Sequence, residues 1–595
     1  MIRNIKLDSD TIKRLGSQAG RIDGPLVAGQ VSRRLLAIHG VLTEVEGRYP
    51  ALFEAAGLAE SRHVLAEAQR ADRESATALL RVPAVGSWAM HCGHHLATAR
   101  TPESLADDIG HFGAIAAVAA LRTERPFEVT ARVREDGILM FPTLGLARGW
   151  SSPGWVRIRS DDGSTLKLIQ AGSSTRTVSP DDSQTDQWWP LRQLRSTVGG
   201  LTIALYLDDI DPYRGHHLPP VAERLTQDEV AHWARQLDEA WAVIAEQPDQ
   251  ARALSVGMVS VVPLKTDART PSVSATARHA IGAAGITSPD GSDALAEALV
   301  HEHQHSLLWA VLDIASLVDD GADQRFYAPW RSDPRPARGL LHGAFAFLGL
   351  LRYWASRSAA DQPAIRMSAA FELALWRVGV RTSIDQLAAS GLLTTSGLIL
   401  IEGMRSTLED MSRRPVPEKL HEMAVGAVQD LQITWRLRNL RPDTGSVRSC
   451  CSAWRNGERR PTLGTSVING EGPRFSGTPR LALLRRQIAC PDKFETTAAD
   501  ARAAGGAAAA DVYLAEGDCS TAADLYAAAA VTAVEQIEAW AGLILAWRDL
   551  GRPEAASLMA HPEYLHAVYA CVAQCTGQRP DADEFAAWFA AGSQR

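Results

Sequence analysis

Five consecutive residues near the middle of the chain, His301-Glu302-His303-Gln304-His305, lie in a stretch from 292 to 317 without proline or glycine. This stretch predicts one continuous helix. Positions four apart on a helix share one face, so His301 and His305 project together, close enough to hold one metal ion. Glu302 lies about 100° round the helix, which suits a catalytic base or a hydrogen-bond acceptor beside the metal. The alternative is two helix histidines that only pack or face water.

A reactive metal needs at least one more protein ligand. We favour His342, which opens an apolar helical segment ending near residue 354, over a core histidine without a ligand role. Imidazole suits iron as well as zinc, so the ligands leave the metal open. The carboxylates that follow the motif are the alternatives: Asp313, Asp319, Asp320, Asp323 and Glu372.

A strand pattern precedes the motif helix. Residues 256–264 read as a strand, and an extended run over 272–286 leads into the turn 288–291, with the helix cap expected near Asp290 or Ser292. A strand, a turn and a metal-binding helix form a zincin-like order, in which the strand can line an extended peptide.

The fold class expected for the whole chain is mainly α with a smaller α+β portion. With 595 residues the chain is too long for one core. Strand candidates at 127–133, 137–141 and 201–207 and a helix at 226–245 lie in the mixed part. The expected regions are an N-terminal helical region 1–125, a mixed region 126–270, a metal-binding helical core 271–440, a linker 441–484 and a tetratricopeptide-like module 485–595.

The last hundred or so residues contain a repeat. Residues 513–517 (YLAEG) and 547–551 (WRDLG) are 34 positions apart, and an alanine-rich stretch follows each. This period is typical of tetratricopeptide helices. Two copies make a weak array, so we expect a contact surface that leans on the rest of the protein.

Composition excludes several partners. The net charge of −8 and the absence of a basic block argue against nucleic acid. No run of eighteen apolar residues predicts a membrane helix, and no secretion signal is evident, so we expect a cytoplasmic protein.

The seven cysteines, without paired CxxC spacing, predict neither a disulfide framework nor a zinc site. Acidic residues 208–211 could bind a cation, but a solvated turn with aspartate caps is favoured.

Several segments resemble one bacterial family, the HExxH-motif peptide-modification proteins, also described as 2-oxoglutarate-dependent HExxH-type peptide β-hydroxylases. The resemblance covers about residues 20 to 410 and excludes the C-terminal repeat. Its segments are 83–88 (PAVGSW), 207–214 (LDDIDPYR), 274–276 (SAT) with 282–283, 299–305 (LVHEHQH), 327–336 (YAPWRSDPRP), 339–343 (GLLHG) and 390–394 (SGLLT).

The resemblance implies an Fe(II) enzyme with 2-oxoglutarate and O2 as cosubstrates. Its substrate would be a ribosomally made precursor peptide, hydroxylated at a side-chain β-carbon, often beside a radical-SAM maturase. Three ligands leave room for a bidentate 2-oxo acid and O2. Arginine binds the distal carboxylate best, and Arg331 is the first candidate, followed by Arg335 or Arg338; Arg278, on the strand before the motif helix, is a further candidate.

Two other functions remain open. The pentapeptide alone indicates a zinc metallopeptidase, in which Glu302 activates a zinc-bound water as general base. The C-terminal repeat is compatible with a non-catalytic partner-binding protein whose metal site is degenerate.

Overall fold

The computed structural model describes residues 5–17, 24–98, 101–172, 175–179, 183–215, 218–265, 272–319, 321, 323–469 and 477–592. Helices predominate over strands, which confirms the expected mainly α fold with a smaller α+β part. The chain forms two compact units, one of Met1–Leu15 with Ala19–Ser316 and one of Gly16–Gln18 with Leu317–Arg595. The division after Ser316 falls inside the region 271–440 that we expected to be one core.

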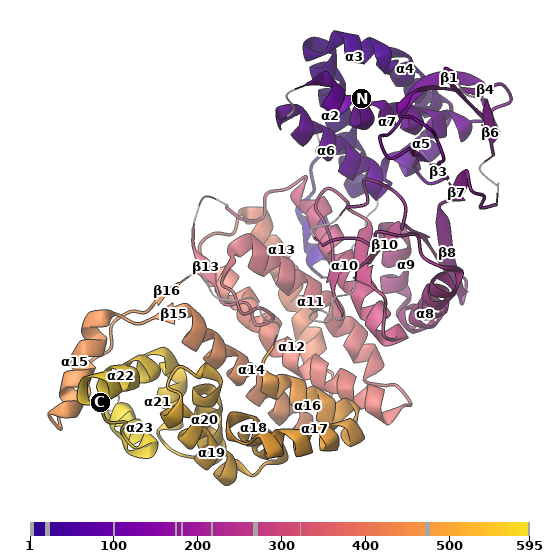
Figure 1. The fold of residues 1–595 in the computed structure, drawn as a ribbon. Helices are drawn as coiled ribbons and strands as arrows, with labels where there is room; N and C mark the ends of the chain where they lie inside the picture. The colour runs from indigo at the N-terminus through magenta and orange to yellow at the C-terminus, as the bar shows by residue number, and fades with distance from the viewer. Residues whose placement is uncertain are drawn as a thin grey trace. The chain divides into compact units, whose positions relative to one another are not determined.

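Unit 1 combines helices with three sheets (Figure 1). Its helices are α1 (Ser9–Gly16), α2 (Gly24–Arg48), α3 (Pro50–Ala55), α4 (Leu58–Ala71), α5 (Arg73–Leu80), α6 (Pro83–Thr98), α7 (Pro102–Leu121), α8 (Gln227–Ala245), α9 (Pro248–Gly257) and α10 (Ser292–Leu312). Its strands are β1 (Phe127–Val133), β2 (Leu139–Phe141), β3 (Gly145–Ala147), β4 (Gly154–Ser160), β5 (Leu166–Gln170), β6 (Arg176–Val178), β7 (Trp188–Pro190), β8 (Arg192–Val198), β9 (Leu201–Leu207), β10 (Ser260–Leu264), β11 (Ser274–Ala275) and β12 (Ala283–Thr287).

Helix α7 forms the centre of the N-terminal part of unit 1. It packs on β1 of the antiparallel sheet β1-β4-β5-β6 through glycines, since a Cβ on Gly113 would lie 1.8 Å from the Thr130 carbonyl oxygen. Among the described helices, α7 alone is long and apolar enough to span a membrane, and 89% of its most apolar window is buried inside the protein. It is therefore built as the core helix of a globular unit.

The five-stranded sheet, in the order β11-β12-β10-β9-β8, positions the motif helix. Its central strands β9, β10 and β12 run parallel, and β10 and β12 are buried along their whole length, as expected for parallel strands covered on both faces. The predicted strand at 256–264 is shorter than expected, because α9 extends to Gly257. The predicted helix at 226–245 is confirmed, with a complete capping box from Thr226 to Glu229.

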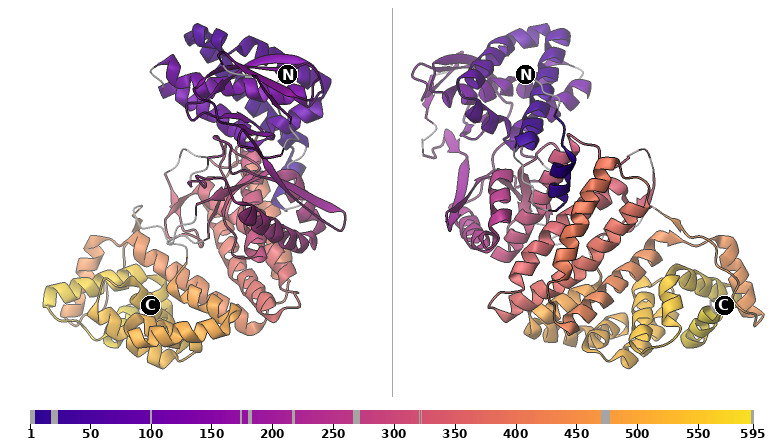
Figure 2. Two further views of the ribbon diagram at one scale, coloured as in Figure 1. Left: turned by 45° about the vertical axis from the view of Figure 1, so that its right-hand side comes forward. Right: turned by 180° about the vertical axis from the view of Figure 1, so that it is seen from behind.

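Unit 2 is almost entirely helical, and its helices stack side by side, salmon to yellow in Figure 2. Its helices are α11 (Ala337–Arg357), α12 (Pro363–Ala389), α13 (Thr395–Ser412), α14 (Glu418–Asn439), α15 (Thr444–Arg455), α16 (Pro479–Ala489), α17 (Pro491–Ala504), α18 (Gly506–Glu516), α19 (Cys519–Thr532), α20 (Ile537–Asp549), α21 (Ala555–Ala560), α22 (Pro562–Thr576) and α23 (Ala582–Ala591). Its short strands are β13 (Arg325–Phe326), β14 (Arg335–Pro336), β15 (Leu440–Arg441) and β16 (Val467–Ile468).

The segment 441–484 is more ordered than a linker. It holds α15 and the start of α16, and α15 buries Cys450 and Cys451 against the C-terminal helices. An Asp443 side-chain cap begins α15. Its apolar contacts come from distant parts of the chain, which is why local composition misled the prediction.

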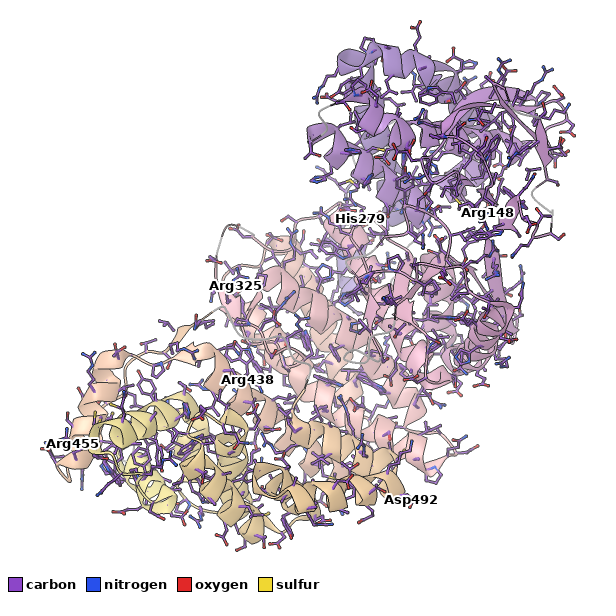
Figure 3. The ribbon with its side chains drawn as sticks, viewed as in Figure 1. Arg148, His279, Arg325, Arg438, Arg455 and Asp492 are labelled. Carbon is purple, nitrogen blue, oxygen red and sulfur yellow. The ribbon has the colours of Figure 1, made fainter. Side chains whose placement is uncertain are left out.

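The two copies of the C-terminal repeat occupy matching places. Gly517 follows the end of α18 and Gly551 follows the end of α20, and both have the left-handed backbone (φ 89° and 69°) that favours glycine. Arg438 at the end of α14, labelled in Figure 3, pairs with Glu538 of α20 and ties the module to the preceding helices.

Candidate metal centre

The turn 288–291 connects the end of β12 to the start of α10. The N-cap is Gly291, between the predicted Asp290 and Ser292, and it makes no side-chain cap bond. The helix ends at Leu312 rather than at 317, and the carboxylate of the next residue, Asp313, accepts hydrogen bonds from Arg33, Gln30 and Arg278. These bonds hold Asp313 outside the helix.

His301 and His305 face each other, as the spacing predicts. Their Nε2 atoms lie 3.1 Å apart, and their rings meet edge to face with centroids 4.7 Å apart. Two nitrogens bound to one ion at about 2.1 Å each would be separated by roughly this distance. Burial lowers the pKa of both imidazoles, and the neighbouring His301 lowers that of His305 further. Both are thus held in the neutral form that binds a metal.

Glu302 is turned into the sheet. Its side chain is 2% exposed, and its two carboxylate oxygens accept hydrogen bonds from the Ser274 hydroxyl (2.6 Å) and the Thr276 hydroxyl (2.5 Å) at β11. Both oxygens are therefore engaged by donors from a neighbouring segment. His303 is also buried, and burial lowers its pKa to about 4.

The predicted third ligand lies in unit 2. His342 is a buried residue of α11, next to Gly343, where a Cβ would lie 2.2 Å from the Trp330 ring. Trp330 in turn stacks on Phe347 at 4.9 Å between centroids. The segments 327–336 and 339–343 thus pack together within this unit, while the membership of His342 in a metal site with His301 and His305 stays a prediction.

The arginines proposed for 2-oxoglutarate share one carboxylate. Arg331 Nε donates to Asp333 at 2.8 Å and Arg335 donates to its other oxygen at 3.1 Å. The two guanidinium groups, 37% and 33% exposed, therefore lie side by side. Hydrogen bonds from both arginines hold the pKa of Asp333 below its ordinary value. Arg278, predicted on the strand before the motif helix, is paired with Asp313 and lies over Trp309.

The alternative carboxylate ligands have other partners. Asp313 belongs to the three-donor cluster above, and Glu372 receives two hydrogen bonds from Arg485. Asp319 accepts the backbone N–H of Gly321, and Asp323 is an exposed partner of Arg325. Asp320 lies outside the described residues.

The acidic strand end at 208–211 is buried, so the prediction of a solvated turn is wrong. Asp208 and Asp211 do accept backbone N–H groups, from Asp211 and Tyr213, as turn caps would. Asp209 pairs with Arg192 at 3.2 Å. Burial, reinforced by the charge of Asp208, raises the pKa of Asp211 to about 8.

A raised carboxyl pKa makes the stability of this turn depend on pH. The unfolded chain releases the Asp211 proton above about pH 4, whereas the folded chain keeps it until about pH 8. The contribution to stability is thus complete below pH 4 and is lost as pH rises to 8. We expect Asp211→Asn, which preserves the acceptor for Tyr213, to flatten this decline in urea unfolding between pH 5 and 8. Asp238→Asn, at an exposed position, is the control. If the free energy of unfolding fell with pH equally steeply in Asp211→Asn and in wild type, the raised pKa of Asp211 would be contradicted.

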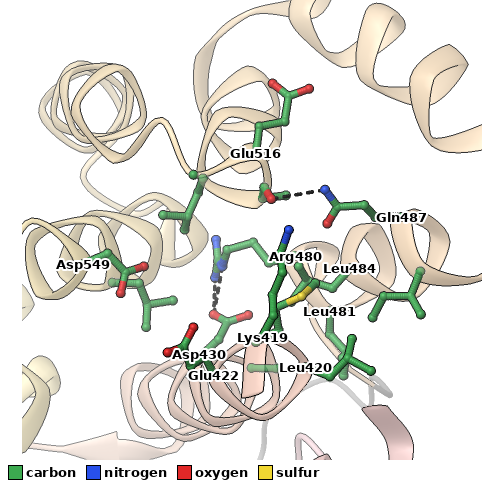
Figure 4. Close-up of a pocket in the computed structure, with 18 of the residues that line it drawn as sticks. Lys419, Leu420, Glu422, Asp430, Arg480, Leu481, Leu484, Gln487, Glu516 and Asp549 are labelled. Carbon is green, nitrogen blue, oxygen red and sulfur yellow. Dashed lines mark hydrogen bonds and ion pairs between the residues drawn. The ribbon is translucent and has the colours of Figure 1, made fainter. Parts of the chain in front are cut away.

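Unit 2 contains a cavity of about 620 Å³ between α14, α16 and α18–α20 (Figure 4). Arg480 crosses it and donates to Asp430 at 2.9 and 2.5 Å and to Asp511 at 3.0 Å. Arg480 thus pairs with two of the carboxylates that line the cavity.

The structure also gathers three thiols that the sequence spacing did not reveal. The Sγ atoms of Cys451 on α15 and of Cys571 and Cys575 on α22 lie within 4.8 Å of one another. All three are free, and burial, with the adjacent Cys571 and Cys575, raises the pKa of Cys451 to about 12. The one-turn spacing of Cys571 and Cys575 was the only signal in the sequence; Cys451 is 120 positions earlier.

No model of a known protein family matches this chain, and no curated protein matches it.

Proposed function

We propose that the chain is an Fe(II)- and 2-oxoglutarate-dependent oxygenase that hydroxylates the β-carbon of a residue in a ribosomally synthesised precursor peptide. The observation that carries the proposal is the pair of imidazoles on α10, 3.1 Å apart, beside a glutamate that is held away by two hydroxyls. The resemblance of the segments around this pair supplies the substrate class.

The residues of α10 fit an iron ion. His301 and His305 would hold it, with His342 as the expected third ligand and Arg331 or Arg335 for the distal carboxylate of 2-oxoglutarate. Bound Fe(II) supplies the activation of O2, with the oxidative decarboxylation of 2-oxoglutarate. The chain's own part is to keep both imidazoles neutral and, through Glu302, to fix the motif helix against β11.

Strand β11 supports a peptide substrate. In the described part of the chain its one strand neighbour is β12, so its other side is an edge. An extended peptide can add to such an edge by backbone hydrogen bonds. The strand also carries Ser274, which contacts Glu302. We therefore place the peptide along β11, in a zincin-like arrangement, and assign the tetratricopeptide-like helices to contact with a partner such as a radical-SAM maturase.

The position of Glu302 supports this proposal over a zinc metallopeptidase. A general base must point a carboxylate oxygen at the metal-bound water, within hydrogen-bond reach. Both oxygens of Glu302 instead accept hydroxyl hydrogens. Glu302 is thus better suited to positioning the helix than to proton transfer.

The direct test is turnover of 2-oxoglutarate without peptide. Protein loaded anaerobically with Fe(II) and then exposed to air should form succinate from 2-oxoglutarate in slow, uncoupled turnover. Zinc-loaded protein that cleaves an unstructured test protein and forms no succinate would overturn the proposal. Protein that takes up neither metal at α10 would favour the non-catalytic reading.

Glu302→Gln separates positioning from base catalysis. The variant removes a charge but keeps a side chain that can accept from Ser274, so it should retain one equivalent of metal at α10. Outer-sphere changes of this kind lower activity by about 10- to 100-fold, and we expect succinate formation to fall by that amount. Ser274→Ala is the matched control and should act in the same direction. Complete loss of turnover in Glu302→Gln, with Ser274→Ala unaffected, would assign Glu302 as the base.

A further inference from the structure

Three side chains of unit 1, away from α10, converge on one another. His91 and His95 lie one turn apart on α6, and Asp108 lies on the following helix, α7. His91 Nε2 is 3.1 Å and His95 Nδ1 is 2.6 Å from the same oxygen, Asp108 Oδ2. The three ligand atoms lie within 4.8 Å of one another.

The other polar contacts of Asp108 leave its Oδ2 to the two imidazoles. Its other oxygen accepts the Tyr213 hydroxyl at 2.8 Å, and that hydroxyl accepts from Arg134 at 3.1 Å. The Trp88 indole N–H donates to the Asp108 carbonyl at 2.7 Å and fixes the backbone beneath it. An anchored carboxylate with an outer hydrogen-bond donor is the arrangement that orients metal ligands.

The cluster is also accessible. The Asp108 side chain is 8% exposed, whereas His95 and His91 are 29% and 54% exposed. The anchored carboxylate thus forms the floor and the imidazoles form the rim. An ion can reach such a site from solvent and keep water on its outer side. Simple His–Asp hydrogen bonding would be satisfied by one imidazole on each carboxylate oxygen. Instead, both imidazoles contact Oδ2, while the Tyr213 hydroxyl donates to Oδ1.

We propose that His91, His95 and Asp108 bind a divalent first-row transition metal ion, independently of the α10 histidines. Two imidazoles and a carboxylate suit Zn(II), Fe(II), Co(II) or Mn(II), while Ca(II) and Mg(II) prefer sites made of oxygen alone. Three protein ligands leave at least one position for water or a small anion, as in reactive rather than structural sites. Tyr213 belongs to the segment 207–214, so one of the segments that resemble the peptide-modification family supports this centre.

The test uses the full chain and Zn(II) and Co(II) as probes, in a His301→Ala/His305→Ala/Cys571→Ser/Cys575→Ser background that removes the α10 pair and the thiol cluster. This background protein should still bind one equivalent of Zn(II), and its Co(II) form should show visible absorption bands. Adding His91→Ala or Asp108→Asn should abolish both signals. Tyr213→Phe should weaken Zn(II) binding by about 10- to 100-fold, and His94→Ala, an exposed histidine on the same helix, should change nothing.

Two results would overturn the proposal. One is a background protein that binds no Zn(II) although circular dichroism shows it folded; the other is one equivalent retained after both His91→Ala and His95→Ala. Because His91 is half exposed, its variant tests the site even if Asp108→Asn fails to fold. The outcome is independent of the proposed oxygenase activity, which is measured at α10.

Discussion

Replacing both His301 and His305 with alanine is expected to remove the metal from α10 and to abolish succinate formation. The Nε2 atoms of these residues lie 3.1 Å apart, close enough to bind one ion. The expected third ligand, His342, would not hold a reactive metal alone. The loss should therefore be complete rather than partial.

The measurement is metal content after anaerobic Fe(II) loading, with succinate formation on the same samples. It is made in the His91→Ala/His95→Ala background, so that the second cluster contributes no metal. Exposed His39→Ala serves as the control and should keep both signals. Stoichiometric iron at α10 without His301 and His305 would contradict the assignment.

His342→Ala in the same background tests the third ligand. If His342 completes the site, the variant should lose its iron although the α10 pair is intact. If iron stays, the third ligand returns to Asp319, Asp320 or Asp323, and the account of His301 and His305 is unaffected.

Arg480→Met is expected to destabilise unit 2 by about 3–5 kcal/mol, the usual effect of removing one partner from a buried ionic cluster. The Arg480 side chain is 6% exposed and bridges two buried carboxylates, Asp430 and Asp511. Thr478 also donates to Asp430, and Tyr526 donates to Asp511. Without the guanidinium, two like charges would stay buried near each other.

Urea unfolding followed by circular dichroism measures this effect. Arg485→Met is the matched control on the same helix, because its ion pair with Glu372 is 43% exposed on the arginine side; exposed pairs contribute about 0–1 kcal/mol. Adding Asp430→Asn and Asp511→Asn to Arg480→Met should recover much of the loss. Equal destabilisation by Arg480→Met and Arg485→Met would mean that the cluster is not the cause.

Local signals in the sequence were sufficient for particular elements. The capping box at Thr226, the alternation over 127–133 and the helical spacing of His301 and His305 each depend on neighbouring residues, and the structure has all three. The predictions that went wrong concern contacts between distant segments. Asp211 is buried by the folding of the chain around it, and α15 is stabilised by helices more than a hundred positions later.

The same reason explains which site residues were missed. His91 and His95 have the same one-turn spacing as His301 and His305, but Asp108 joins them from the next helix, and Tyr213 from a further 105 positions along the chain. Cys451 likewise meets Cys571 and Cys575 only in the folded unit. Such sets have no spacing that a single sequence reveals.

The central claim is that α10 holds iron which binds 2-oxoglutarate. The most direct measurement is visible absorption during anaerobic addition of 2-oxoglutarate to the Fe(II)-loaded protein, in the His91→Ala/His95→Ala background. We predict a metal-to-ligand charge-transfer band that saturates at one equivalent and is absent from His301→Ala/His305→Ala. A protein that retains zinc at α10, shows no band with iron and cleaves peptide bonds would contradict the account.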